Sequence, residues 1–303
     1  MTTVGLIGLG AMGSGMAGSL RRAGHAVHVF DVRSEVAAAF AKDGGTAHDS
    51  LASLGAACDV IVSVVVNAAQ TESVLFGDGT HTEGTSGCAA SMKPGSVFVM
   101  CSTVDPNWSV ALDSRLEAMG LQYVDAPISG GAAKAASGQM TMMTAGKPEA
   151  YAVAEPFLNA MAAKVYKLGD SAGAGSKVKI INQLLAGVHI AAAAEAMALG
   201  LREGVDAAAL YEVITNSAGN SWMFENRMAH VLANDYTPLS AVDIFVKDLG
   251  IVLDMARASK FPLPLSSTAH QMFMQASTAG FAKEDDSAVI KIFPGIELPK
   301  GKA

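Results

Sequence analysis

Lys179 and Asn182 are a lysine and an amide that lie three residues apart in segment 176–203, whose apolar spacing predicts one long helix. Residues at this spacing share one face of a helix, so both side chains are expected to point in the same direction. A lysine on an otherwise apolar helix is costly to bury without a chemical task. The alternative is a lysine near a helix end whose ammonium group extends into solvent.

A glycine-rich loop near the N-terminus, Gly-Leu-Gly-Ala-Met-Gly at 8–13, fits the pattern G-x-G-x-x-G. It follows a predicted strand at 3–9 and opens a predicted helix at 12–22, the context that distinguishes a dinucleotide-binding loop from an ordinary turn. The first glycine permits the tight turn, the second lets the backbone approach a pyrophosphate, and the third lets the helix pack on the strand. The expected cofactor-binding residues are Gly8, Gly10, Ala11, Met12 and Gly13.

Asp31 follows a second predicted strand, 26–30, about twenty residues after that loop. A carboxylate there would accept hydrogen bonds from the adenosine ribose hydroxyls and repel a 2′-phosphate, which favours NAD as the cofactor. Arg33 keeps NADP as the alternative, because an arginine at this position could hold the 2′-phosphate. Taken alone, Asp31 could also be a turn residue before a helix.

Two continuous apolar runs, 60–66 and 97–101, predict strands that are buried on both faces. Ligands of parallel sheets bind outside the carboxyl ends of the strands, so the residues at these ends should line the cofactor site. The hydroxyl groups of Ser102 and Thr103 could touch the nicotinamide or the substrate, or they could instead cap the turn that follows them. The residues expected to line the site are Val65, Val66, Gln70 and Thr103.

The segment 125–131, Asp-Ala-Pro-Ile-Ser-Gly-Gly, follows another predicted strand at 122–125. Its hydroxyl group and the backbone N–H groups of its two glycines could form a cradle for a carboxylate, since glycine allows a ligand to approach the backbone closely. An ordinary loop is an equally good interpretation of these residues alone. The residues of the cradle are Ser129, Gly130 and Gly131.

The elements that must position these residues alternate between strand and helix in the first part of the chain, which predicts a mostly parallel sheet with helices on both faces. After Gly169 the pattern is helical. We therefore predict an α/β fold, with an N-terminal Rossmann-type doubly wound sheet at 1–170 and an all-α substrate and oligomerisation domain at 171–303, joined by a long helix. Further strands are expected at 140–145 and 163–168, and further helices at 36–42, 110–119, 149–161, 205–217, 223–234, 242–259 and 265–279.

The composition excludes several classes of protein. Of 303 residues 50% are apolar and 16% are charged, so the chain is too apolar to be intrinsically disordered, and its length favours two domains. The net charge of -7 argues against nucleic acid as a partner, although a local lysine could still hold a small anionic substrate. Three cysteines without C-x-x-C spacing indicate neither a disulfide framework nor a metal site, and favour a reducing compartment, the cytoplasm.

The low charge concentrates in the helices that follow Ser176. The apolar stretch 184–201 is long enough to raise the question of a membrane span, but it contains His189 and Glu195, so a buried helix is the better interpretation. A small helical domain cannot easily bury this stretch by itself. We therefore expect no membrane partner, and burial against a second subunit in a homodimer or homotetramer.

Several motifs follow one another along the chain: GLIGLGAMGSGMA at the start, DAPISGGAAKAASGQ at 125–139, GSKVKIINQ at 175–183, FVKDL at 245–249 and AKEDDSAVI near the end. Together they resemble the β-hydroxyacid dehydrogenase family, which includes 3-hydroxyisobutyrate dehydrogenase and is related to 6-phosphogluconate dehydrogenase. The first four correspond to the family's cofactor, substrate, catalytic and distal-lysine motifs. Gln183 departs from the pattern, because the family has a second asparagine there.

The resemblance implies an NAD-dependent hydroxyacid dehydrogenase. In it Lys179 would be the catalytic lysine, Asn182 would orient the substrate, and Gln183 would keep an amide beside the substrate on a longer side chain. The cradle at 129–131 would bind the substrate carboxylate. Thr103 and Lys247 would contact the cofactor or the substrate pocket.

The stretch KIINQLLAGVHIAAAAEAMALG is most similar to the sugar-acid branch of the family. This implies oxidation of the C2 hydroxyl of L-threonate to a 2-oxo acid, with 3-hydroxyisobutyrate, or tartronate semialdehyde and glycerate, as alternatives. An ordinary lysine titrates near about 10.4, so burial and a neighbouring cation such as Lys247 would have to lower the pKa of Lys179 for it to act as the base. A non-catalytic NAD-binding scaffold is the alternative of another class.

Overall fold

The computed structural model describes residues 2–77 and 86–301. The chain forms two compact units, Met1–Lys179 and Ile180–Ala303, which are described separately below. The first unit contains a sheet with helices, and every regular element among the described residues of the second is a helix, so the predicted fold class is confirmed. The units divide inside a long helix, after the boundary at 170 and 171 that we expect from the sequence.

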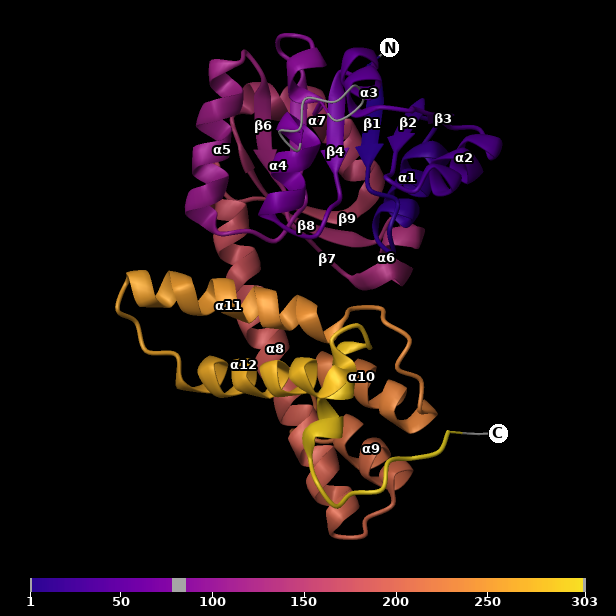
Figure 1. Cartoon of the computed structure of the whole chain (residues 1–303), viewed down its shortest axis with the longest axis vertical. Helices are drawn as coiled ribbons and strands as arrows, with labels where there is room; N and C mark the ends of the chain where they lie inside the picture. Colours follow the sequence, from indigo (N-terminus) through magenta and orange to yellow (C-terminus); the bar gives the residue numbers. More distant parts are fainter. Residues whose placement is uncertain (1, 78–85, 302–303) are drawn as a thin grey trace. The chain divides into compact units, whose positions relative to one another are not determined.

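The first unit is built on a nine-stranded sheet with the order β3-β2-β1-β4-β5-β6-β8-β7, in which β9 pairs with β8 (Figure 1). The strands from β1 to β6 run parallel, while β8 is antiparallel to β6 and β7. The strands are β1 Val4–Ile7, β2 Val27–Phe30, β3 Thr46–Ala47, β4 Val60–Ser63, β5 Val97–Met100, β6 Gln122–Asp125, β7 Ile128–Ser129, β8 Met140–Gly146 and β9 Ala162–Lys167.

Helices cover both faces of this sheet because alternate strand residues point to opposite sides. Val60 and Val62 belong to an apolar core shared with α1, α2 and α7, whereas Ile61 between them belongs to a second core shared with α3, α4 and α5. The helices of this unit are α1 Gly13–Arg22, α2 Ser34–Lys42, α3 Leu51–Ala57, α4 Ala68–Phe76, α5 Pro106–Ala118, α6 Gly131–Ser137 and α7 Pro148–Met161, with the short turn η1 Ala89–Ser91.

Three short helices, α3, α4 and α6, are absent from our sequence-based predictions. The signals for two of them were their caps: Ser50 accepts a hydrogen bond from the N–H of Ser53, and Asn67 accepts one from the N–H of Gln70. Helices of seven to nine residues show too few turns for an apolar period to stand out, so only such caps could have revealed them.

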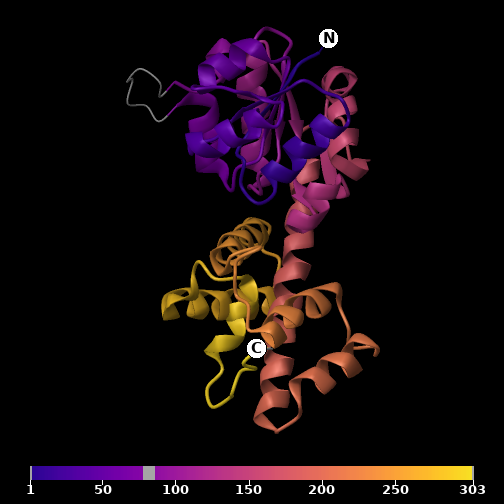
Figure 2. The ribbon, with the colours of Figure 1, turned by 90° about the vertical axis from the view of Figure 1, so that its right-hand side faces the viewer.

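The second unit contains most of α8 and the helices that follow it, and Figures 1 and 2 show these helices around the C-terminal part of α8. By length and composition α8 could cross a membrane, and 44% of its most apolar window is buried inside the protein. Ile190, Ala194 and Met197 of α8 are part of the apolar core of this unit. The elements are α8 Ala174–Arg202, α9 Ala207–Thr215, α10 Trp222–Ala233, α11 Val242–Ala258, α12 Pro264–Ala276, η2 Ser277–Phe281 and η3 Asp286–Ile292.

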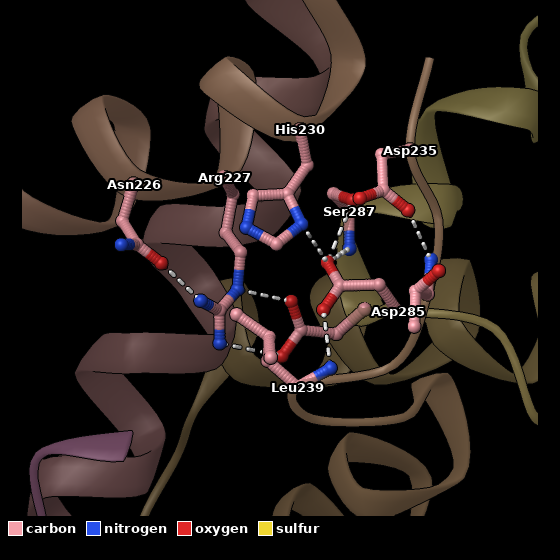
Figure 3. Close-up of polar contacts among 9 residues, drawn as sticks. Asn226, Arg227, His230, Asp235, Leu239, Asp285 and Ser287 are labelled. Carbon is pink, nitrogen blue, oxygen red and sulfur yellow. Dashed lines mark hydrogen bonds and ion pairs between the residues drawn. The ribbon is translucent and has the colours of Figure 1, made fainter. Parts of the chain in front are cut away.

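A buried charged cluster attaches the start of η3 to α10 (Figure 3). The guanidinium group of Arg227 donates to both carboxylate oxygens of Asp286, whose side chain is fully buried. Asp285 beside it accepts hydrogen bonds from the N–H of Leu239 at 3.1 Å and from the hydroxyl of Ser287 at 2.7 Å. Burial raises the pKa of Asp286 to about 6, although the guanidinium group opposes that rise.

We expect Arg227→Met to lower the free energy of unfolding by about 3–5 kcal/mol near pH 8, because a buried carboxylate then loses its guanidinium partner. Without Arg227 the folded-state pKa of Asp286 should rise further above its unfolded value. Such a group contributes stability that is present below its unfolded pKa and is lost as the pH rises through its folded pKa. The deficit measured by urea unfolding should therefore be smaller near pH 5.5 than near pH 8.

Arg257→Met is the matched control for this experiment. Arg257 donates to Asp254 at 3.0 Å, but both side chains are exposed, so the pair should contribute less than about 1 kcal/mol at either pH. Equal losses of stability in the two arginine variants would contradict the prediction.

Candidate active site

Four neighbouring parallel strands, β1, β4, β5 and β6, end at the same level of the sheet. Ile7 pairs with Ser63, Ser63 pairs with Met100, and Met100 pairs with Asp125, and each of these is the last residue of its strand. The segments that follow β1, β4, β5 and β6 therefore leave the same edge side by side. These segments contain the glycine loop, the Val65–Val66 turn, Thr103 and the 126–131 loop, so the sheet brings them to one edge, where α/β sheets bind their ligands.

The glycine loop is packed so closely that side chains would not fit at two of its positions. A Cβ atom at Gly8, where φ is 92°, would lie 2.5 Å from the carbonyl oxygen of Val64, and one at Gly13 would overlap the carbonyl oxygen of Gly8. Gly10 differs, because nothing lies within 4 Å of the position of its Cβ. This open backbone before the start of α1 fits a pyrophosphate group, so the residues suit the dinucleotide that the motif predicts.

Asp31 connects the glycine loop to the end of β2. Its Oδ2 accepts a hydrogen bond from the N–H of Leu9 at 2.6 Å, and its Oδ1 accepts from the N–H of Arg33 at 2.9 Å and from the guanidinium Nε at 3.1 Å. Burial raises the pKa of Asp31, but the hydrogen bonds from Arg33 and Leu9 outweigh it and hold the pKa below its ordinary value. The side chain is thus a charged acceptor at the loop, the chemistry required to bind ribose hydroxyls.

Two side chains, Gln70 and Ser102, hold the turn after β4 by hydrogen bonds to its backbone. Gln70 accepts a hydrogen bond from the N–H of Val66 at 2.8 Å, which closes the turn. Ser102 donates to the carbonyl oxygen of Val65 at 2.9 Å, so the ends of β4 and β5 are joined just before Thr103. Ser102 is buried, and its hydroxyl, which the sequence suggests for contact with the cofactor or the substrate, binds the backbone of the neighbouring strand end.

The 129–131 cradle forms the junction of β7 and α6, since Ser129 ends the strand and Gly131 begins the helix. Ser129 pairs with Thr141 of β8, and the next two glycines have φ angles of 142° and 76°, which other residues rarely adopt. Nothing lies within 4 Å of a Cβ atom at Gly131, so its backbone remains approachable. The geometry is compatible with the expected binding of a small carboxylate.

Lys179 lies in the second turn of α8 and its exposed fraction is 7%, so it is buried rather than extended into solvent. The start of this helix approaches the sheet through Gly175, where a Cβ atom would overlap the carbonyl oxygen of Met143 and lie 2.9 Å from that of Asp125. The first turn of the helix that carries Lys179 therefore lies against β6 and β8, and the 126–131 loop begins at the end of β6. This placement agrees with the interpretation of Lys179 as a lysine with a chemical task.

In the second unit, Asn182, Gln183 and Lys247 are joined through Asp248 of α11. The amide of Asn182 donates to Oε1 of Gln183 at 3.0 Å, and Nε2 of Gln183 donates to Oδ2 of Asp248 at 2.5 Å. The ammonium group of Lys247 donates to the other carboxylate oxygen. Asp248 has an exposed fraction of 1%, so it is no surface residue, and sequence reasoning missed it as a site residue. Because a carboxylate only accepts, it determines which way the Gln183 amide points.

Two family models match the chain. Residues 3–169 match the NAD-binding domain of 6-phosphogluconate dehydrogenase, and residues 173–293 match the NAD-binding domain of NADP-dependent 3-hydroxyisobutyrate dehydrogenase. The chain belongs to the β-hydroxyacid dehydrogenase family. The resemblance seen in the motifs is thereby confirmed. Both matching family models describe regions that bind a nicotinamide cofactor, so this hydroxyacid dehydrogenase uses such a cofactor.

Individual β-hydroxyacid dehydrogenases match over nearly their whole length. L-threonate dehydrogenase of Cupriavidus necator is 67% identical over 300 residues, which cover 99% of this chain and 98% of that protein. The mitochondrial 3-hydroxyisobutyrate dehydrogenase of Mus musculus is 32% identical over 96% of this chain and 86% of that protein. A crystal structure described as 3-hydroxyisobutyrate dehydrogenase from Salmonella typhimurium has a TM-score of 0.91 and 51% identity, and covers 97% of this chain and 100% of that one.

Proposed function

We propose that this hydroxyacid dehydrogenase oxidises the C2 hydroxyl of L-threonate to give 2-oxo-tetronate. The observation that carries the proposal is the 67% identity to an L-threonate dehydrogenase along 99% of the chain. The match to 3-hydroxyisobutyrate dehydrogenase of Mus musculus is 32%, which makes 3-hydroxyisobutyrate the second candidate substrate. Gln183 also distinguishes this chain from the general family motif within the catalytic segment.

The roles of the residues in this reaction follow from their chemistry. The cradle formed by Ser129, Gly130 and Gly131 binds the substrate carboxylate, and Asn182 orients the hydroxyl group. Lys179, whose side chain is buried, takes the hydroxyl proton, a step that requires its neutral amine. When bound, the nicotinamide supplies the hydride acceptor. The carboxylate of Asp248 aligns the Gln183 amide, and through it the amide of Asn182.

We propose NAD rather than NADP as the cofactor. The support is the charged and buried carboxylate of Asp31, which would repel a 2′-phosphate and accept from the ribose hydroxyls. Arg33 donates to this carboxylate, so its guanidinium group is engaged where a 2′-phosphate would need it. The lysine at 247 and the hydroxyl of Thr103 are proposed to contact the cofactor or the substrate beside it.

A screen of hydroxy acids with optical detection of NAD reduction tests the substrate. We expect kcat/KM for L-threonate to exceed that for 3-hydroxyisobutyrate and for glycerate by at least about 100-fold, because a site that hydrogen-bonds an extra hydroxyl rejects an analogue without it. Strong turnover of 3-hydroxyisobutyrate without activity on L-threonate would reverse the assignment. Binding of NAD without turnover of any acid would favour a scaffold instead.

We further propose that the protein is a cytoplasmic homodimer or homotetramer, without nucleic acid or membrane partners. Along α8 the apolar side chains of Ile181, Leu185 and Leu199 are 54%, 51% and 62% exposed, and their spacing places them on one face of the helix. A second copy of the chain would cover this face, and the buried free thiols suit a reducing compartment. Light scattering at micromolar concentration should give at least twice the chain mass, and a monomer would contradict the proposal.

A further inference from the structure

Asp125, the last residue of β6, holds the start of α8. Its Oδ2 accepts hydrogen bonds from the N–H groups of Gly173 and Ser176, both at 2.9 Å, and its Oδ1 accepts from the Ser176 hydroxyl at 2.6 Å. The first N–H groups of a helix have no partners within the helix, so this carboxylate caps α8 from a strand about fifty residues earlier in the chain.

The backbone reinforces this attachment. Asp125 pairs with Met100 of β5 and with Ala145 of β8, so the carboxylate stands on a residue held from both sides by the sheet. Gly175 lets the first turn of α8 lie against the backbone of the same strands. The start of the helix has therefore little freedom to shift along or away from the sheet.

The position of Lys179 depends on this attachment. Ser176 and Lys179 are three residues apart in α8, so they share a face, and helical side chains lean toward the helix N-terminus. The side chain of Lys179 thus leaves the helix on the side where Ser176 meets Asp125. The loop that begins at residue 126 continues from that same aspartate and carries the cradle at 129–131.

Burying the carboxylate of Asp125 costs free energy of folding, so a contribution to stability alone does not explain why it is there. Asp125 is fully buried, and burial raises its pKa while the donors from Ser176, Gly173 and Ser109 oppose the rise. The hydroxyl of Ser109 in turn lies 2.9 Å from that of Tyr123, so a buried polar network surrounds the carboxylate. Apolar residues often replace such networks without loss of stability, whereas a polar network specifies one geometry.

We propose that Asp125 is a positioning residue for the dehydrogenase reaction, which sets the place of the Lys179 ammonium group relative to the substrate loop. This inference rests on the proposed role of Lys179 as the base. A displacement of about 1 Å at a reacting group can lower the rate by about 100-fold without weakening binding. The carboxylate should therefore affect kcat far more than the affinity for the cofactor.

Asp125→Asn and Asp125→Ala test this in the full-length enzyme, with Ser176→Ala as a milder variant that removes one of the three hydrogen bonds between Asp125 and the start of α8. We expect kcat to fall by about 100-fold for the alanine variant and less for asparagine, which retains one acceptor oxygen. The dissociation constant of NAD should stay within about twofold, because the glycine loop belongs to β1, three strands away in the sheet order. Amide hydrogen exchange should rise in the first turn of α8.

Asp206→Asn is the matched control, because Asp206 caps α9 through the N–H of Ala209 at 2.9 Å and holds no reacting group. It should leave kcat unchanged. The proposal is overturned if Asp125→Asn and Ser176→Ala both keep kcat within twofold of the parent, or if kcat, NAD affinity and melting temperature decline together. Lys179→Met, measured in parallel, separates the role of Lys179 as the base from the role of Asp125 in positioning it. If Lys179→Met retains turnover, the lysine is not the base. If it is inactive while the Asp125 variants are normal, only the positioning role of Asp125 fails.

Discussion

Lys179→Met and Lys179→Arg are both expected to lower kcat for the hydroxy acid by about 10²–10⁴-fold, the usual contribution of a general base. Methionine carries no basic group, and arginine remains protonated at any pH at which the enzyme is folded. The side chain at this position is 7% exposed, so water cannot readily replace the missing amine. Stopped assays with saturating NAD measure the effect, and the affinity for NAD should change little.

Lys177→Met is the matched control for the lysine experiment. Lys177 lies two residues earlier in α8 and is exposed, so its loss should leave kcat within about twofold. Near-normal turnover in either Lys179 variant would exclude the lysine as the base. A decline in the Lys177 variant that equals the decline at Lys179 would point to a general effect of charge on the helix.

Asp31→Asn is expected to reduce kcat/KM with NAD by about 10- to 100-fold, since a charged hydrogen bond contributes about 1.5–3 kcal/mol. Asparagine retains an oxygen for the N–H of Leu9, so the glycine loop should keep its shape. The loss of the negative charge also removes the repulsion of a 2′-phosphate and weakens the hold on Arg33, which can then pair with that phosphate. The preference should therefore shift toward NADP, as measured by initial rates with both cofactors.

The double variant Asp31→Asn/Arg33→Ala identifies the source of the shift. If the guanidinium group holds the 2′-phosphate, the activity with NADP should fall again while that with NAD changes little. An unchanged ratio of NAD to NADP activity in Asp31→Asn would contradict the assignment of Asp31 as the residue that selects the cofactor.

Local sequence patterns predicted the elements whose residues follow a clear short pattern. A buried parallel strand and a phosphate-binding loop each require certain residues within one short continuous stretch. The Val/Ile run of β4 and the glycine loop at 8–13 could therefore be identified from neighbouring residues alone. The short helices α3, α4 and α6 were missed, because a helix of two turns owes its stability to caps and packing rather than to a period.

Local sequence patterns were enough to predict the doubly wound fold, the glycine loop with Asp31, and Lys179 as a lysine on an apolar helix. Only the tertiary structure revealed what orients these groups. Asp125 and Ser176 are 51 residues apart in the sequence, and Asp248 and Gln183 are 65 apart. The partner of each carboxylate therefore cannot be recognised from the residues around it. Hydrogen bonds between distant segments depend on how strands and helices pack, and a buried carboxylate acts through the donors that packing brings to it.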